Sequence, residues 1–110
     1  MSLAALTLVA SACATSINHV LADPSRYRNK DVRVSGRVTD SYSIVGRGAY
    51  RLTDRSGELW VISDRGVPRR GADVTVKGTI RETVNLGALS ERVRIPAGAV
   101  VLIESEHRAR

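Results

Sequence analysis

The chain has 110 residues, of which 43% are apolar, 25% charged and 4% aromatic, a composition typical of one globular domain rather than a disordered or fibrous chain. At this length a core can form without disulfides or a metal, and a single cysteine cannot form an internal bridge. No uncharged apolar run approaches the ~20 residues of a membrane-spanning helix. The composition therefore predicts one globular domain that does not span a membrane.

The 17 basic residues outnumber the 11 acidic ones, which gives a formal net charge of +6. An excess of this kind favours contact with anionic partners, including nucleic acid. The basic residues are nearly all arginines, and they are spread along the chain instead of clustering in one run. This distribution fits a solvated basic surface better than a nucleic-acid-binding stripe.

Residues 1–12 carry no charged side chain, are rich in Leu, Ala and Val, and end in three small residues before Cys13. Such a segment is typical of a secretory signal peptide, which is removed and takes no part in the fold. The alternative is a short apolar strand or helix that packs on the core, with Cys13 as a small buried side chain.

The end of this segment resembles the lipobox of bacterial lipoproteins, in which a small residue precedes a cysteine that is lipidated after cleavage. The resemblance implies acyl chains on Cys13, and several chains at one terminus anchor a protein stably to a membrane. It also implies a lipid-anchored, periplasm-facing location in the bacterial cell envelope. Ala14, where an Asp retains many lipoproteins in the inner membrane, favours the outer membrane.

Residues 13–30 are expected to form a linker and a short helix. Ser16 is a suitable N-cap, and Ile17, Val20 and Leu21 recur at helical spacing on one face. The helix should end at Asp23, before a proline.

Two later segments alternate apolar and polar residues, as half-buried strands do. They share a Val-x-Val-x-Gly pattern, from Val32 to Gly36 and from Val74 to Gly78. A glycine inside a strand favours a bend or bulge. The echo therefore predicts two equivalent corners of one barrel, with a loop at 43–48 after the first strand.

Between these corners, the segment 54–57 begins with Asp and ends with Gly, which suits a four-residue hairpin turn. The turn predicts a register in which Leu52 faces Leu59 inside the barrel and Arg51 faces Trp60 outside. The segment 66–71 is too short for a helix. After a loop at 85–94, which has room for a helical turn near 86–90, a last strand is expected at 99–104, followed by a flexible tail at 106–110.

This pattern of five strands, two glycine bends and a tight central hairpin resembles the OB-fold of exported bacterial proteins and lipoproteins. The fold class predicted is all-β, a five-stranded Greek-key barrel over residues 31–105. OB-folds commonly bind ligands on the outer face of the second and third strands and on the loops beside it. Carried onto this sequence, that candidate binding face consists of Arg47, Arg51, Thr53, Trp60, Ile62, Asn85, Arg92 and Arg94.

No catalytic motif, metal-ligand spacing or phosphate-binding glycine loop is present in the sequence. The sequence therefore predicts a protein that is not an enzyme and needs no cofactor or metal: a lipid-anchored envelope module whose basic face binds an anionic ligand or an envelope protein. A nucleic-acid-binding OB domain is the alternative, and a small hydrolase ranks last. The Arg51–Trp60 pair stays open between a structural cross-strand contact and a stacking site.

Overall fold

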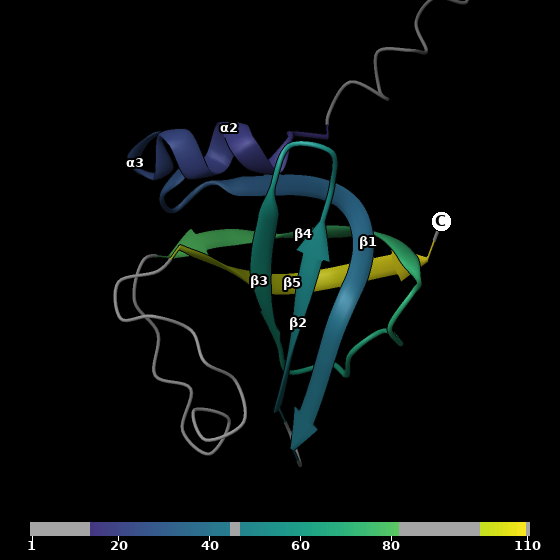
Figure 1. Ribbon diagram of the computed structural model, residues 1–110. Coiled ribbons are helices and arrows are strands. Elements are labelled where there is room, and N and C mark those ends of the chain that lie inside the picture. The colour runs from purple at the N-terminus through teal and green to yellow at the C-terminus, as the bar shows by residue number, and fades with distance from the viewer. Residues whose placement is uncertain (1–13, 45–46, 82–99, 110) are drawn as a thin grey trace, which may run out of the picture.

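The computed structural model describes residues 14–44, 47–81 and 100–109. Its five strands form a closed barrel in the order β1-β2-β3-β5-β4 (Figure 1). All neighbours are antiparallel except β3 and β5, which are parallel. The strands are β1 (Asp31–Ile44), β2 (Arg47–Thr53), β3 (Glu58–Ser63), β4 (Asp73–Arg81) and β5 (Val101–Ala109). The predicted all-β class and five-stranded barrel are confirmed.

The barrel interior is filled by the apolar side chains that alternate along each strand. In β4, burial follows a strict period of two, with each apolar or glycine position buried and each intervening position half-buried. The largest fully buried side chain is Tyr50. The buried core comprises Ile17, Val20, Val32, Val34, Val38, Tyr50, Leu52, Leu59, Val61, Val74, Val76, Ile80 and Leu102.

The central hairpin has the predicted register. Leu52 lies opposite Leu59, and Arg51 lies opposite Trp60. In the turn, Asp54 Oδ1 accepts hydrogen bonds from the backbone N–H groups of Ser56, at 2.7 Å, and Gly57, at 3.0 Å. The turn residues therefore hold the two strands in the alignment that buries both leucines.

At two positions in the barrel, the backbones of paired strands approach each other too closely for a side chain. A Cβ atom on Gly36 would lie 2.6 Å from the carbonyl oxygen of Thr53, and one on Gly78 would clash with the carbonyl oxygen of Ile103. Register shifts lie between Val38 and Asp40, beyond Gly36 on β1, and between Lys77 and Gly78, directly beside Gly78. Both glycines therefore lie where a neighbouring backbone excludes a side chain, and each strand pair concerned contains a β-bulge.

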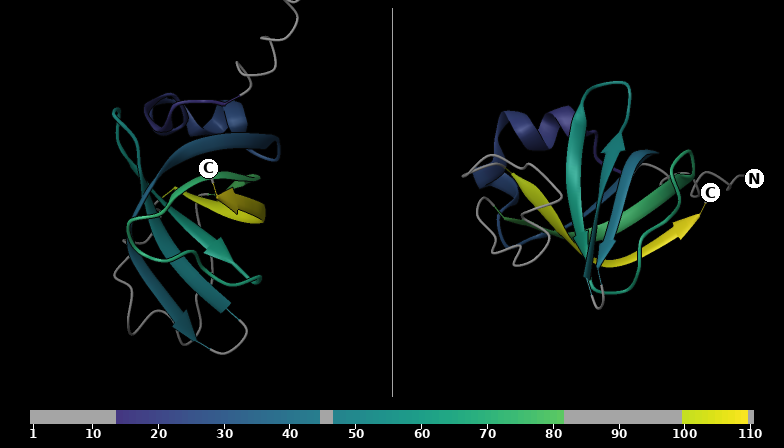
Figure 2. Two further views of the ribbon diagram at one scale, coloured as in Figure 1. Left: turned by 90° about the vertical axis from the view of Figure 1, so that its right-hand side faces the viewer. Right: turned by 60° about the horizontal axis from the view of Figure 1, so that its bottom comes forward.

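Two short helices, α2 (Ile17–Ala22) and α3 (Pro24–Tyr27), lie across one end of the barrel (Figures 1 and 2). The Ser16 side chain caps α2, as predicted, by accepting from the N–H of His19. Ile17 is fully buried, whereas Leu21 is 37% exposed. Leu21 lies at the edge of the packed stripe, near the hairpin turn, so its predicted place on the buried face is only partly correct.

Asp54 also joins α2 to the hairpin, because its Oδ2 accepts a 2.9 Å hydrogen bond from the N–H of Ile17. Burial alone would raise the pKa of Asp54, but hydrogen bonds from Ile17, Ser56 and Gly57 outweigh it and lower the pKa below its ordinary value. The ionised carboxylate is the better acceptor for these N–H groups. One side chain thus holds both the turn and the helix that covers the barrel end.

Several predicted boundaries are wrong. β1 continues to Ile44 and β2 begins at Arg47, so most of the expected loop at 43–48 is strand. β5 begins at Val101 and reaches Ala109, so residues 106–109 are not a flexible tail. The reason is pairing with β4, which places Glu106 opposite Lys77 and Ala109 opposite Val74.

Other expectations are met or lie outside the described residues. The segment between β3 and β4 contains no helix, as predicted. In the part of the chain that the structure describes, no helix is both long enough and apolar enough to cross a membrane. The expected helical turn at 86–90 and residues 1–13 lie outside the described ranges.

Replacing Gly78 with Ala should destabilise the barrel by about 1–3 kcal/mol, because the new methyl group meets backbone atoms that cannot move independently. Urea denaturation of wild type and variant measures the change. Gly57→Ala is the matched control, since its methyl group would meet only side-chain atoms at 3.5 Å or more, and we expect it to stay within about 1 kcal/mol of wild type. Equal stability of the two variants would contradict the inference that the β5 backbone leaves no room for a side chain at position 78.

Candidate functional site

The outer face of the β2–β3 hairpin carries the pair predicted from the register. The guanidinium carbon of Arg51 lies 5.8 Å from the centre of the Trp60 ring, in the geometry of a cation–π contact. Both side chains are half-buried, as is Thr53 on the same face. The cross-strand Arg51–Trp60 contact is therefore confirmed.

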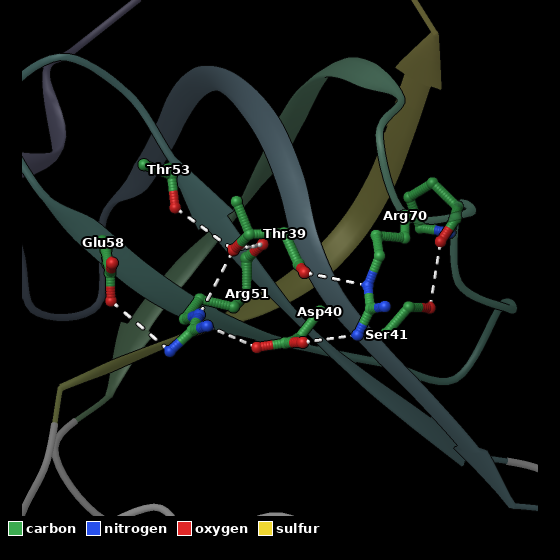
Figure 3. Close-up of polar contacts among 8 residues, drawn as sticks. Thr39, Asp40, Ser41, Arg51, Thr53, Glu58 and Arg70 are labelled. Atoms are coloured by element: carbon green, nitrogen blue, oxygen red, sulfur yellow. Dashed lines mark hydrogen bonds and ion pairs between the residues drawn. The ribbon is translucent and has the colours of Figure 1, made fainter.

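A β-bulge in β1 supplies the partners of Arg51. Val38 pairs with Leu52 and Asp40 with Arg51, which leaves Thr39 as the extra residue. An extra residue reverses the in–out alternation, so Asp40 lies outside with Arg51 rather than in the core. Arg51 Nε donates to Thr39 Oγ1 at 3.2 Å, and Arg51 Nη2 donates to Asp40 (Figure 3).

Further ion pairs balance the charge of this face. Arg51 Nη1 lies 3.6 Å from a carboxylate oxygen of Glu58. Asp40 also binds Arg70 at 2.9 Å, so one carboxylate bridges two guanidinium groups (Figure 3). At the start of β2, Arg47 Nε lies 3.5 Å from Asp64. Arg47 and Arg51 each have a carboxylate partner, so the predicted positive surface is close to neutral here.

Ile62, placed by the sequence on the binding face, is only 3% exposed and cannot be a contact residue. It packs with Ala49 and Val101 in a small second cluster on the outer side of the sheet. The parallel partner β5, which places Ile103 opposite Ile62, supplies apolar neighbours that the hairpin alone does not have.

Tyr42 is the aromatic residue of this face that sequence reasoning missed. Its ring centre lies 6.1 Å from that of Trp60, with the planes tilted by 36°. Both rings are partly buried and pack against the cluster beneath them. The sequence signal for Tyr42 was the alternation of inward and outward positions, which continues beyond Thr39 to Ile44. It was hidden because the bulge shifts this alternation by one residue.

The remaining predicted site residues, Cys13, Asn85, Arg92 and Arg94, lie outside the described residues. Within the described ranges, no group of three His, Cys, Asp or Glu side chains is arranged to hold a metal ion.

A second polar cluster lies inside the barrel around Glu104. One carboxylate oxygen accepts from the Tyr50 hydroxyl, and the other accepts from Ser63 Oγ at 3.1 Å. His107 Nδ1 lies 2.9 Å from the second oxygen. The Glu104 side chain is fully buried. Its carboxylate is thus surrounded by hydrogen-bond donors, as a buried charged group requires.

The bulge in β5 produces this arrangement. Gly78 pairs with Glu104 and Lys77 with Glu106, so Ser105 is the extra residue. Glu104 and His107, three positions apart, consequently point to the same side of the strand. Burial raises the pKa of Tyr50 far above its ordinary value, and the adjacent Glu104 carboxylate raises it further. Tyr50 therefore stays a neutral donor at physiological pH.

No protein-family model and no curated protein sequence matches the chain. Among solved structures, it is similar to asparaginyl-tRNA synthetase from Pyrococcus horikoshii, with 15% identity and a TM-score of 0.64 over 87% of this chain and 22% of that one. It is also similar to an OBody bound to hen egg-white lysozyme (21% identity, TM-score 0.57, 76% and 84% of the two chains). A third similar structure is a replication protein A heterotrimer bound to ssDNA, with 16% identity and a TM-score of 0.55 over 73% of this chain and 57% of that one.

The barrel is an OB-fold. This OB-fold chain spans about a fifth of the synthetase that it matches. At these identities the likeness shows the fold, and function has to be argued from the site.

Replacing Glu104 with Ala should destabilise the protein by about 3–5 kcal/mol, because the Tyr50 and Ser63 hydroxyls lose their buried acceptor. Glu104→Gln keeps one acceptor oxygen and should cost less. Glu58→Ala removes the same type of side chain from the exposed face and should change the free energy of unfolding by about 1 kcal/mol or less. Urea denaturation of the three variants gives the order of their free energies of unfolding. If Glu104→Ala proved as stable as Glu58→Ala, the buried cluster would contribute nothing to stability.

Proposed function

We propose that this OB-fold chain is a binding module that takes single-stranded nucleic acid on the outer face of β1, β2 and β3. The observation that carries the proposal is the pair of neighbouring rings, Tyr42 and Trp60, with the Arg51 guanidinium over Trp60. Aromatic rings and an arginine in this arrangement offer stacking surfaces for successive bases, whatever their sequence.

The similar structures support this ligand class. The replication protein A structure is bound to ssDNA, and the synthetase is named for a tRNA. The OBody structure is bound to a protein, so a protein ligand on the same face is the competing outcome. The excess of basic residues, +6 over the whole chain, favours an anionic ligand.

The ion pairs around Arg51 define how a phosphate could enter. Asp40 is held by two arginines and is only 19% exposed, whereas Glu58 is 57% exposed and lies 3.6 Å from Arg51. A phosphodiester oxygen would therefore displace Glu58 more readily than Asp40. Because the arginines already have carboxylate partners, stacking contributes more to affinity than net charge does.

We infer binding rather than catalysis. The residue types of a hydrolytic site do occur together, in Glu104, Ser63 and His107, but the Glu104 carboxylate is fully buried and Ser63 is 1% exposed. A substrate has no access to either group, so this cluster is best explained as part of the core.

Trp60 is the single tryptophan of the chain, so quenching of its fluorescence by an oligothymidylate of about 12 nucleotides tests the proposal, within the site sizes of roughly 4–16 nucleotides that OB-folds cover. Anisotropy of the labelled oligonucleotide then measures affinity in variants. Trp60→Leu and Tyr42→Leu should each weaken binding about 5- to 150-fold, the loss of one stacked base. Glu58→Gln should strengthen it by freeing Arg51.

Trp60→Phe is the control, because it retains a ring and should retain most of the affinity. Absence of quenching, or equal affinity of Trp60→Leu and Trp60→Phe, would reject nucleic acid as the ligand of this face.

A lipid-anchored module of the bacterial envelope is the second candidate, supported by the uncharged apolar segment that ends in small residues at Cys13. An anchored protein would present the same face to an envelope partner instead of to nucleic acid, so location separates the two proposals.

Intact mass of the protein from the membrane fraction should then show loss of residues 1–12 and gain of acyl chains. Cys13→Ser should release the protein from membranes, whereas Ser11→Ala, a change of similar size that leaves the cysteine, should not. Soluble cytosolic protein that retains Met1 would exclude the envelope proposal.

A further inference from the structure

The outer face of β1, β4 and β5 places two like charges directly opposite each other. Arg33 on β1 pairs in register with Lys77 on β4. Like charges in directly opposite positions destabilise a sheet. Within the described part of the chain, neither side chain has a carboxylate within ion-pair distance.

The same two strands show the usual arrangement four residues further along. Arg37 lies opposite Asp73, and Arg37 Nε is 3.3 Å from the Asp73 carboxylate. On the outer face of β1 and β4, the Arg37–Asp73 position therefore pairs opposite charges. The Arg33–Lys77 position, four residues away along each strand, pairs like charges. An anion that binds between Arg33 and Lys77 would offset the electrostatic repulsion between them.

A hollow of about 270 Å³ lies at this position. Strand register brings its walls together, since Thr75 lies opposite Arg108 and Lys77 opposite Glu106. Three cations face one carboxylate around the hollow, which is lined by Arg33, Thr75, Lys77, Glu106, His107 and Arg108.

We propose that this hollow binds an oxyanion of the phosphate type. Two arginine guanidinium groups can each donate two parallel hydrogen bonds to such an anion, and a lysine adds a compact charge. Thr75 contributes a hydroxyl that already pairs with Ser35 at 2.8 Å. The His107 side chain points to the inner side of β5, where Nδ1 is engaged by Glu104, so the outward-facing side chains supply the ligands.

A second hollow, of about 350 Å³, adjoins the first and shares Arg33 and Lys77 with it. Its other lining residues include Tyr27 and Lys30. An organic group attached to the phosphate therefore has an aromatic ring beside it, together with the oppositely charged side chains of Lys30 and Asp31. This site shares no residue with the Tyr42–Trp60 face, although both use β1, so the inference does not rest on the function proposed above.

Backbone amide NMR during titration with inorganic phosphate, at ionic strength held constant with chloride, tests the site. The signals of Arg33, Thr75, Lys77 and His107 should move together and saturate. Lys77→Gln and Arg33→Gln should each weaken binding about tenfold or more, the loss of a charged hydrogen bond. Glu106→Gln should tighten it about two- to fivefold, since an exposed repulsive charge is removed.

Arg65→Gln is the matched control, because it removes the same charge from an exposed position on the β3–β4 connection. It should leave the dissociation constant for phosphate unchanged, as should Trp60→Leu. Signal changes no larger than those in chloride alone, or equal weakening by Arg65→Gln and Lys77→Gln, would overturn the proposal.

Three probes separate the sources of the phosphate: inorganic phosphate, a dinucleotide, and vesicles that contain phosphatidylglycerol. The site is supported if Lys77→Gln weakens, and Glu106→Gln strengthens, the binding of at least one probe. The probe that binds most tightly then identifies the source of the phosphate. Absence of such dependence for all three rejects it.

Discussion

The rest of the structure depends on the close approach of backbones at Gly36 and Gly78. At these points a strand passes over the carbonyl oxygen of a neighbour with no room for a side chain, and only glycine permits the approach. The two close approaches lie within the β1–β2 and β4–β5 pairings, which are part of the closed barrel. Closure removes free sheet edges and determines which residues face the interior.

The β1–β2 and β4–β5 pairings each contain a single extra residue, and these two bulges define both polar sites. Thr39 moves Asp40 to the outer face, where it binds Arg51 and Arg70. Ser105 brings Glu104 and His107 to the same inner side. The backbone feature that bends the sheet therefore also sets the chemistry of its two faces, as bulges commonly do near functional sites.

This dependence explains what could be predicted from the sequence. Alternation predicts the inner face of β4 and the Arg51–Trp60 pair, because both lie in regular stretches that a turn or a period of two aligns. It fails beyond each bulge, where one unpaired residue reverses the pattern without a compositional signal. Tyr42 is missed for this reason, and Glu104, expected at the end of the last strand, lies in the middle of β5.

Tertiary pairing is equally invisible in the sequence. Residues 106–108 are polar and carry no strand signal of their own, yet they pair with β4. Ile62 is expected on the surface because the hairpin alone leaves it outside, whereas β5 beside it completes an apolar cluster. The sequence therefore predicts the Arg51–Trp60 pair on β2 and β3, but the charge balance around that pair and its second ring require the folded chain.

The position of β5 in the strand order has a consequence for how the chain folds during synthesis. Among the strands that the structure describes, β5 comes last in sequence order, and it alone pairs with both β3 and β4. Until its residues leave the ribosome, both partners have an unpaired edge, and pairings between segments so far apart in sequence form slowly. Exposed edges of this kind are open to pairing with other chains, so the nascent protein is most prone to aggregate in the interval before β5 arrives.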